Sequence, residues 1–236
     1  MLLDTFRYPF RGPDARSVWA ALAGFGLTAS LLARFAVGLY PSALSLVPAL
    51  LAVVPLVLWA GYCHRLVATT IEGATELPPA RSLRELARDG VRTAAVTGIY
   101  LSVPTAVLLV TVRGAGSLSP ADVSGGGGAL FVLGTTVTLC LALAIVYLYP
   151  GAFAALADGE PLVTALDPRG RGYVYRHSAY FLTWVVAFTV GGLGATLFGV
   201  VLAGRGVEGL LALAVTVYTS QVAARLVGVG YGRVVR

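Results

Sequence analysis

The order of apolar and polar positions divides the 236-residue chain into six long apolar runs separated by short polar segments. Each run is close to the length of about 20 residues that an α-helix needs to cross the ~30 Å hydrocarbon core of a bilayer. Helices satisfy their backbone hydrogen bonds internally, and lipid offers no other partner. The pattern therefore predicts an all-α polytopic membrane protein, a single domain over residues 1–236. The six predicted transmembrane helices are residues 18–39, 43–62, 93–112, 129–148, 180–203 and 209–228.

Composition and charge support this environment and indicate an orientation. Hydrophobic residues make up 57% of the chain and charged residues 12%, and the mean hydropathy is +0.83, which leaves too little polar surface for a water-soluble globule. All 17 basic residues are arginines, of which only Arg34, Arg113 and Arg205 lie on the side opposite the N-terminus. By the positive-inside rule we expect a plasma membrane protein with both termini in the cytoplasm. This topology explains the net charge of +6 without a nucleic acid partner.

Two segments outside the apolar runs are amphipathic. Leu2, Leu3 and Phe6 recur at helical spacing before Pro9, which predicts a short helix on the cytoplasmic interface, with a disordered tail as the alternative. Residues 80–91 place apolar side chains on one face and charged side chains on the other, which predicts a second interfacial helix before the third span. Its charged face is either a solvated surface or a patch that binds a partner.

Spans two and three resemble a first copy of a unit whose second copy is spans four and five. Glu72-Gly73 follows the second span, and Asp158-Gly159 follows the fourth span 86 residues later in the chain. Each turn leads through a short polar segment into the next span. This spacing favours an internal repeat of two helical hairpins with the same orientation.

The fifth span carries small residues at every fourth position. Such a stripe allows the backbone of another helix to approach closely, which is how helices associate in lipid. The partner helix lies either within this chain or in a second copy. The residues of this helix-packing face are Ala187, Gly191, Ala195, Gly199 and Ala203.

The sixth span has a candidate polar face near its cytoplasmic end, formed by Tyr218, Gln221 and Arg225. In the first span, Arg34 lies about one turn from the outer end, where it either snorkels to the interface or forms an ion pair inside the bundle. Prolines inside the second and third spans either expose carbonyl groups to a cavity or reflect the frequency of proline in membrane helices. These prolines are Pro48, Pro55 and Pro104.

The candidate chemistry is sparse. Within the predicted boundaries no span contains an acidic residue, a histidine or a lysine, which disfavours ion or proton coupling and intramembrane hydrolysis. Cys63 and Cys140 are far apart in sequence and indicate neither a disulfide nor a metal site. His64 and His177 do not show the spacing of a ligand motif. We therefore predict no catalytic residue, no cofactor and no metal.

Several short motifs follow one another in a definite order. They are Tyr8-Pro9-Phe10-Arg11-Gly12, Gly61-Tyr62, Leu77-Pro78 with Leu86 and Asp89-Gly90, Tyr149-Pro150 with Asp158-Gly159 and Ala165-Leu166-Asp167, Ser178-Ala179-Tyr180 with Trp184, and Tyr218-Thr219-Ser220-Gln221 leading to Gly228 and Tyr231. In this order, which covers nearly the whole chain, the sequence resembles an archaeal and bacterial integral-membrane family, domain of unknown function 4013, familiar from halophilic archaea. It departs from the family pattern at Leu166, where a phenylalanine is expected, and after Pro78, where an acidic-aromatic pair is absent. The resemblance implies the fold and supplies no catalytic residues.

Three functional hypotheses follow from these observations. The leading one is a non-enzymatic scaffold or accessory subunit of a membrane complex, which joins a second copy or another membrane protein through the fifth span and the cytoplasmic amphipathic segments. The alternative is a facilitator or permease for a small neutral or lipid-like molecule, with the polar face of the sixth span along its path. A third is a lipid-modifying enzyme that uses the cytoplasmic histidine and aspartate residues.

Overall fold

The computed structural model describes residues 2–80, 82–117, 126–204 and 206–236, and within these ranges the regular structure is helical, without a β-strand. Six helices have the length and hydropathy to cross a membrane, which confirms the predicted all-α fold with six spans. They are α2 (Ala15–Leu39), α3 (Leu46–Ile71), α4 (Leu83–Ser117), α6 (Gly126–Ala157), α9 (Ser178–Ala203) and α10 (Val207–Val235). The short elements are α1 (Leu2–Arg7), η1 (Tyr8–Phe10), η2 (Ala43–Ser45), α7 (Leu162–Leu166), η3 (Arg169–Arg171) and α8 (Gly172–Tyr175).

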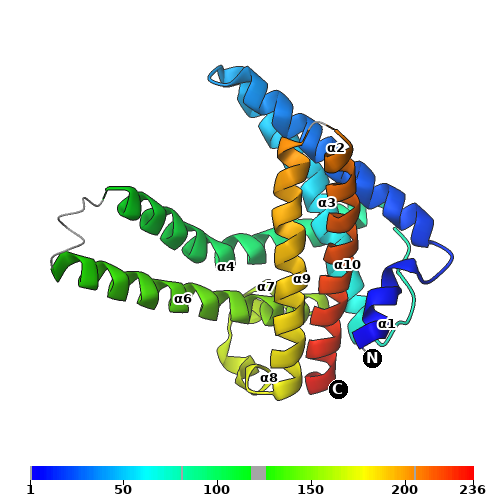
Figure 1. Ribbon diagram of the computed structural model, residues 1–236. Helices are drawn as coiled ribbons and strands as arrows, with labels where there is room; N and C mark the ends of the chain where they lie inside the picture. Colours follow the sequence, from blue (N-terminus) through cyan, green and yellow to red (C-terminus); the bar gives the residue numbers. More distant parts are fainter. Residues whose placement is uncertain (1, 81, 118–125, 205) are drawn as a thin grey trace.

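The long helices form three hairpins that diverge from a common base (Figure 1). The base contains both termini, the connection between α3 and α4, and the connection between α6 and α9 that carries α7 and α8. The α4/α6 hairpin, here called the arm, extends away from the α9/α10 hairpin at a wide angle (Figure 1). Helix α10 packs against α9, α3 and α2, so the main core lies where the hairpins meet.

The helices exceed the predicted spans mainly at their base ends. Helix α3 continues to Ile71 and α6 to Ala157, and each is followed by a glycine with a left-handed backbone, Gly73 at φ 92° and Gly159 at φ 98°. The paired backbone hydrogen bonds of a Schellman motif close both ends. Hydropathy marks the part of a helix that suits lipid, whereas the helix itself ends where a glycine reverses the chain. The two turns of the proposed repeat therefore share one helix-ending geometry.

The interfacial helix expected over residues 80–91 is not a separate element. Residues 83–91 form the first turns of α4, which continues without a break into the third span. Gly61 of α3 and Gly90 of α4 face each other so closely that a Cβ on Gly61 would clash with the Leu86 carbonyl, and one on Gly90 with the Val57 carbonyl. This glycine crossing holds the amphipathic segment against α3, which is why it does not lie apart as its own helix.

His64 lies in the part of α3 that continues beyond the predicted span of residues 43–62. Because α3 extends to Ile71, His64 lies inside a helix that can span the membrane. Its side chain is only 8% exposed, its Nδ1 lies 3.2 Å from Oγ1 of Thr93 in α4, and its ring lies 6.1 Å from that of Phe153 in α6. The histidine is thus packed where three helices meet.

Candidate functional site

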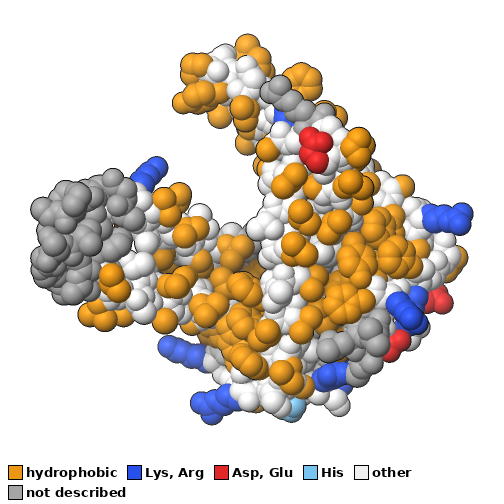
Figure 2. Space-filling view, in the orientation of Figure 1, with side chains coloured by type: hydrophobic (Ala, Val, Ile, Leu, Met, Phe, Trp, Pro, Cys, Tyr) orange, Lys and Arg blue, Asp and Glu red, His pale blue; other side chains and the backbone are white. Residues whose placement is uncertain are grey.

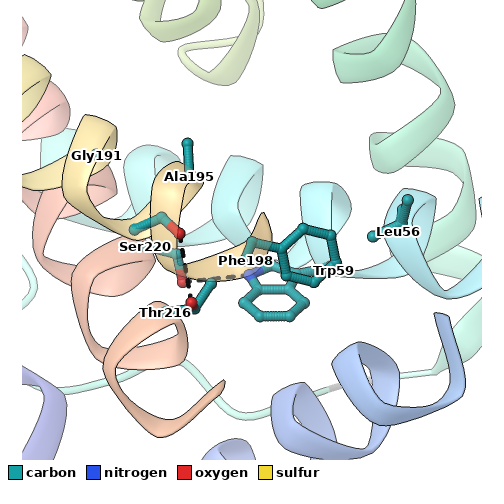
Figure 3. A pocket seen from close by; sticks show the side chains of 8 residues that line it. Leu56, Trp59, Gly191, Ala195, Phe198, Thr216 and Ser220 are labelled. Carbon is teal, nitrogen blue, oxygen red and sulfur yellow. Dashed lines mark hydrogen bonds between the residues drawn. The ribbon is translucent and has the colours of Figure 1, made fainter. Parts of the chain in front are cut away.

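An apolar cleft lies between the arm and the α9/α10 hairpin. Its larger part has a volume of about 410 Å³ and is lined by residues of α3, α4, α6, α9 and α10. A smaller part of about 240 Å³ continues between α3, α9 and α10, and both parts share Gly191, Ala195 and Ser220 (Figure 3). Figure 2 shows the hollow between the arm and the hairpin, with hydrophobic side chains along its sides. The two parts together are called the cleft below.

Aromatic side chains form the walls of the cleft. Tyr149 and Phe153 of α6 stack with an interplanar angle of 5°, and Trp184 and Phe188 of α9 stack on the other wall at 18°. Near the base, the Tyr147 ring of α6 meets the Trp184 ring edge-on at a centroid distance of 4.9 Å. These contacts join α6 and α9 at the base end of the cleft and define its depth.

The polar groups of the cleft are paired within the chain. Trp59 Nε1 donates a hydrogen bond to Ser220 Oγ at 3.2 Å (Figure 3). Ser220 Oγ donates to the Val217 carbonyl at 2.9 Å. Thr216 Oγ1 donates to the Ala212 carbonyl at 2.8 Å. The residues that line the described cleft include no charged side chain and no histidine. Such a lining suits an apolar occupant.

The predicted small-residue stripe of α9 turns gradually from α10 toward the cleft. Ala187 is buried, and a Cβ on Gly191 would lie 3.6 Å from Ala223 Cβ of α10. Ala195 lines the cleft and is exposed, and Gly199 and Ala203 are also exposed. A step of four residues advances about 40° around an α-helix, so the stripe cannot stay on one face over four steps. Within the chain, only its first part packs on α10.

The predicted polar face of α10 does not line the cleft. The Tyr218 hydroxyl donates to the Phe6 carbonyl at 3.0 Å, so this face lies against the N-terminal segment. Gln221 is fully buried, and neither its amide nitrogen nor its amide oxygen has a hydrogen-bond partner in the described part of the chain. The surface expected to border a permeation path is therefore covered by protein.

Arg225 completes this buried polar face. Its guanidinium lies 4.0 Å from the centroid of the Tyr8 ring and donates to Thr70 Oγ1 at 3.3 Å and to the Ala74 carbonyl. Burial raises the pKa of Tyr8, and the charge of Arg225 opposes this shift. Arg225 thus joins α10 to the end of α3 and to the N-terminal segment.

Arg34 has a role that the sequence did not reveal. Its guanidinium donates to the carbonyl oxygens of Val201 at 2.7 Å, of Leu202 at 3.2 Å and of Gly204. The side chain therefore caps the carboxyl end of α9, where unpaired carbonyls and the helix dipole favour a cation. It neither snorkels away from the protein nor forms an ion pair, and it joins α2 to α9 far from the base. Its partners are backbone groups, which no side-chain motif can indicate.

The two histidines are not brought together. His64 contacts Thr93, whereas His177 is the N-cap of α9, where its Nδ1 accepts a hydrogen bond from the Ala179 amide at 3.2 Å. Among the described residues, no group of three or more His, Cys, Asp and Glu side chains is arranged to hold a metal ion. Both cysteines are free thiols.

Six apolar helices around a base-centred core define a class, the multi-pass α-helical integral membrane proteins. Within it, the chain belongs to the family described as "Protein of unknown function (DUF4013)", whose sequence profile matches residues 43–204. The matched region runs from η2 to the end of α9 and so includes the arm and most of the cleft. The chain matches no curated protein and no solved structure.

Proposed function

We propose that the chain is a non-enzymatic scaffold or accessory subunit of a membrane complex, and that the cleft receives a transmembrane helix of a partner protein. The observation that carries this proposal is the small-residue surface that α9 leaves open beside the cleft. Gly192, Ala195 and Gly199 are exposed, and a Cβ on Gly192 or Gly199 would meet nothing within 4 Å. Helix α10 occupies a different face of α9 and leaves this one unused.

The physics of helix association in lipid favours a helix as the occupant. Acyl chains are as apolar as leucine, so two helices associate mainly where small residues let their backbones approach. The cleft residues of α9 extend from Trp184 to Phe198, which is about 21 Å of helix length or nearly four turns. This length supports a helix–helix contact of ordinary size. A lipid-like molecule, the occupant that a facilitator would carry, is the other outcome of the test below.

The proposal includes an orientation in the plasma membrane with the base in the cytoplasm. Its support is the placement of arginine, because 13 of the 15 arginines among the described residues belong to base segments or base ends of helices. Most of the basic side chains visible in Figure 2 surround the base. In a variant with Cys63→Ser and Cys140→Ser, a cysteine introduced at Ser42 should react with a membrane-impermeant maleimide on intact cells, and one introduced at Gly170 should not. The reverse pattern would refute the orientation.

Photo-crosslinking in the native membrane tests the occupant. A benzophenone amino acid at Gly199 faces the open surface of α9, and the same amino acid at Gly24, an exposed glycine of α2, is the matched control. We expect a protein adduct of defined mass at Gly199 and none at Gly24, and Gly192→Leu should abolish the adduct. Lipid adducts alone at both positions would contradict the scaffold proposal and favour a lipid-like occupant.

A further inference from the structure

The first three turns of α4 present arginines that have no counter-ion among the residues that the structure describes. Arg84, Arg88 and Arg92 follow at steps of four residues, which places them within an arc of about 80° on one helix face. All three are exposed, and no carboxylate of the described residues forms an ion pair with them. Two carboxylates belong to the same turns. Glu85 has its Oε2 3.6 Å from Arg65 Nη1, and Asp89, which directly follows Arg88, forms no ion pair with the three arginines.

A surface cavity of about 640 Å³ accompanies these arginines, lined by Ser82, Arg84, Glu85 and Arg88. It lies at the amino end of α4, where the helix dipole and the first-turn amides add positive potential. Arginine presents a planar fork of N–H donors that matches two oxygens of a phosphate group. The cavity therefore suits a phosphate monoanion or diester in spite of the single carboxylate at its edge.

The same face of α4 becomes apolar about two turns further along. Val91 beside the arginines is 61% exposed, Ile99 is 53% exposed, and Val103 is 44% exposed. About 10 Å of helix separates Arg92 from Ile99. A ligand that satisfies the whole face thus needs an anionic head and an apolar tail, in that order along α4. Neither a free phosphate ion nor a nucleic acid backbone has this form.

We propose that the start of α4 is a binding site for an anionic phospholipid, whose head-group phosphate contacts Arg84 and Arg88 and whose acyl chain lies along Ile99 and Val103. The site is separate from the cleft on α9, so the lipid-binding proposal does not depend on the scaffold function. It predicts preference for a negatively charged head group over a zwitterionic one, because no described carboxylate pairs with these arginines.

The test uses the full-length protein in mild detergent and native mass spectrometry with dioctanoyl phosphatidylglycerol, dioctanoyl phosphatidylcholine and inorganic phosphate as probes. The double variant Arg84→Gln with Arg88→Gln should weaken phosphatidylglycerol binding roughly tenfold or more. The matched control is Arg169→Gln with Arg176→Gln, which removes the same charge from two other exposed arginines of the base. This control should retain the affinity of the parent protein.

Each other outcome overturns the assignment. Equal losses of phosphatidylglycerol affinity in both double variants would mean that positive charge anywhere on the base attracts the lipid, and that α4 has no specific site for it. Equal binding of the two lipids would remove the role of the anionic head, and competition by inorganic phosphate at equal concentration would remove the role of the acyl chain. Ile99→Asn provides a separate check, since it should weaken the lipid while leaving the arginines intact.

Discussion

The buried amide of Gln221 leads to a prediction about stability. Its side chain is fully buried on α10, and neither polar atom of the amide has a partner in the described structure. A buried polar group without a hydrogen bond costs about 1–3 kcal/mol relative to the unfolded state, where water or detergent head groups satisfy it. Methionine has a similar length and flexibility and lacks the amide. Gln221→Met should therefore raise the free energy of unfolding by about 1–3 kcal/mol.

Thermal unfolding in mild detergent, followed by circular dichroism at the helical minimum, measures this gain. For a chain of this size, each kcal/mol corresponds to a shift of roughly 2–4 °C in the unfolding temperature. The matched control is Thr216→Val, which removes a buried hydroxyl that does have acceptors, the carbonyls of Ala212 and Gly194. The control should show no gain.

A lower unfolding temperature of Gln221→Met would contradict the prediction that the buried amide destabilises the fold. It would show that the amide is satisfied in the membrane, for example by an ordered water, and that Gln221 contributes to the structure through that partner. The same measurement with Gln221→Glu would then separate the two cases, because a charge without a partner at this position should be far more costly than an amide.

Three further predictions concern the joints of the fold. Gly61→Ala should lower the free energy of unfolding by about 1–3 kcal/mol or prevent a monodisperse preparation, because its Cβ would clash with α4. The control is Gly98→Ala, where a Cβ meets nothing within 4 Å and the free energy of unfolding should not fall. Equal behaviour of the two variants would contradict the glycine crossing. Arg34→Gln should lower the unfolding free energy by about 1–3 kcal/mol through lost caps on α9, whereas the exposed Arg113→Gln should have little effect in the same thermal assay. The pKa of Tyr8 is raised by burial above its usual 10.0, so the stability linked to its proton is present below pH 10 and is lost as pH rises through the raised pKa. Tyr8→Phe should therefore flatten the fall in unfolding temperature between about pH 9 and pH 11, and an unchanged slope would mean that other groups cause the fall.

The number and order of the spans could be predicted because lipid imposes one requirement on every segment that crosses it, an apolar helix of sufficient length. The positions of the helix ends near Gly73 and Gly159 are harder to predict from the sequence. The two turns indicate these ends, but α3 and α6 each continue nine residues beyond the predicted spans, because hydropathy falls before the helix ends. His64 lies in this extension of α3.

The cleft could not be predicted from the sequence, because its residues come from five helices whose angles depend on close contacts between them. The glycine crossing that sets the angle of the arm requires backbone coordinates. The small residues of α9 recur at a spacing that is visible in the sequence, but which of them meet α10 depends on how the two helices cross. Ala187 does so, whereas Gly199 is left exposed.

The crossing of Gly61 and Gly90 has a mechanical consequence. Arg34 ties the outer ends of the first and third hairpins together, whereas the described joint between α3 and the arm lies close to the base. The arm can then rotate about this crossing, beyond which α4 continues for about 40 Å. A rotation of about 5° would displace the far end of the arm by roughly 3–4 Å at that length. Small adjustments between two glycines would thus set how wide the molecule opens.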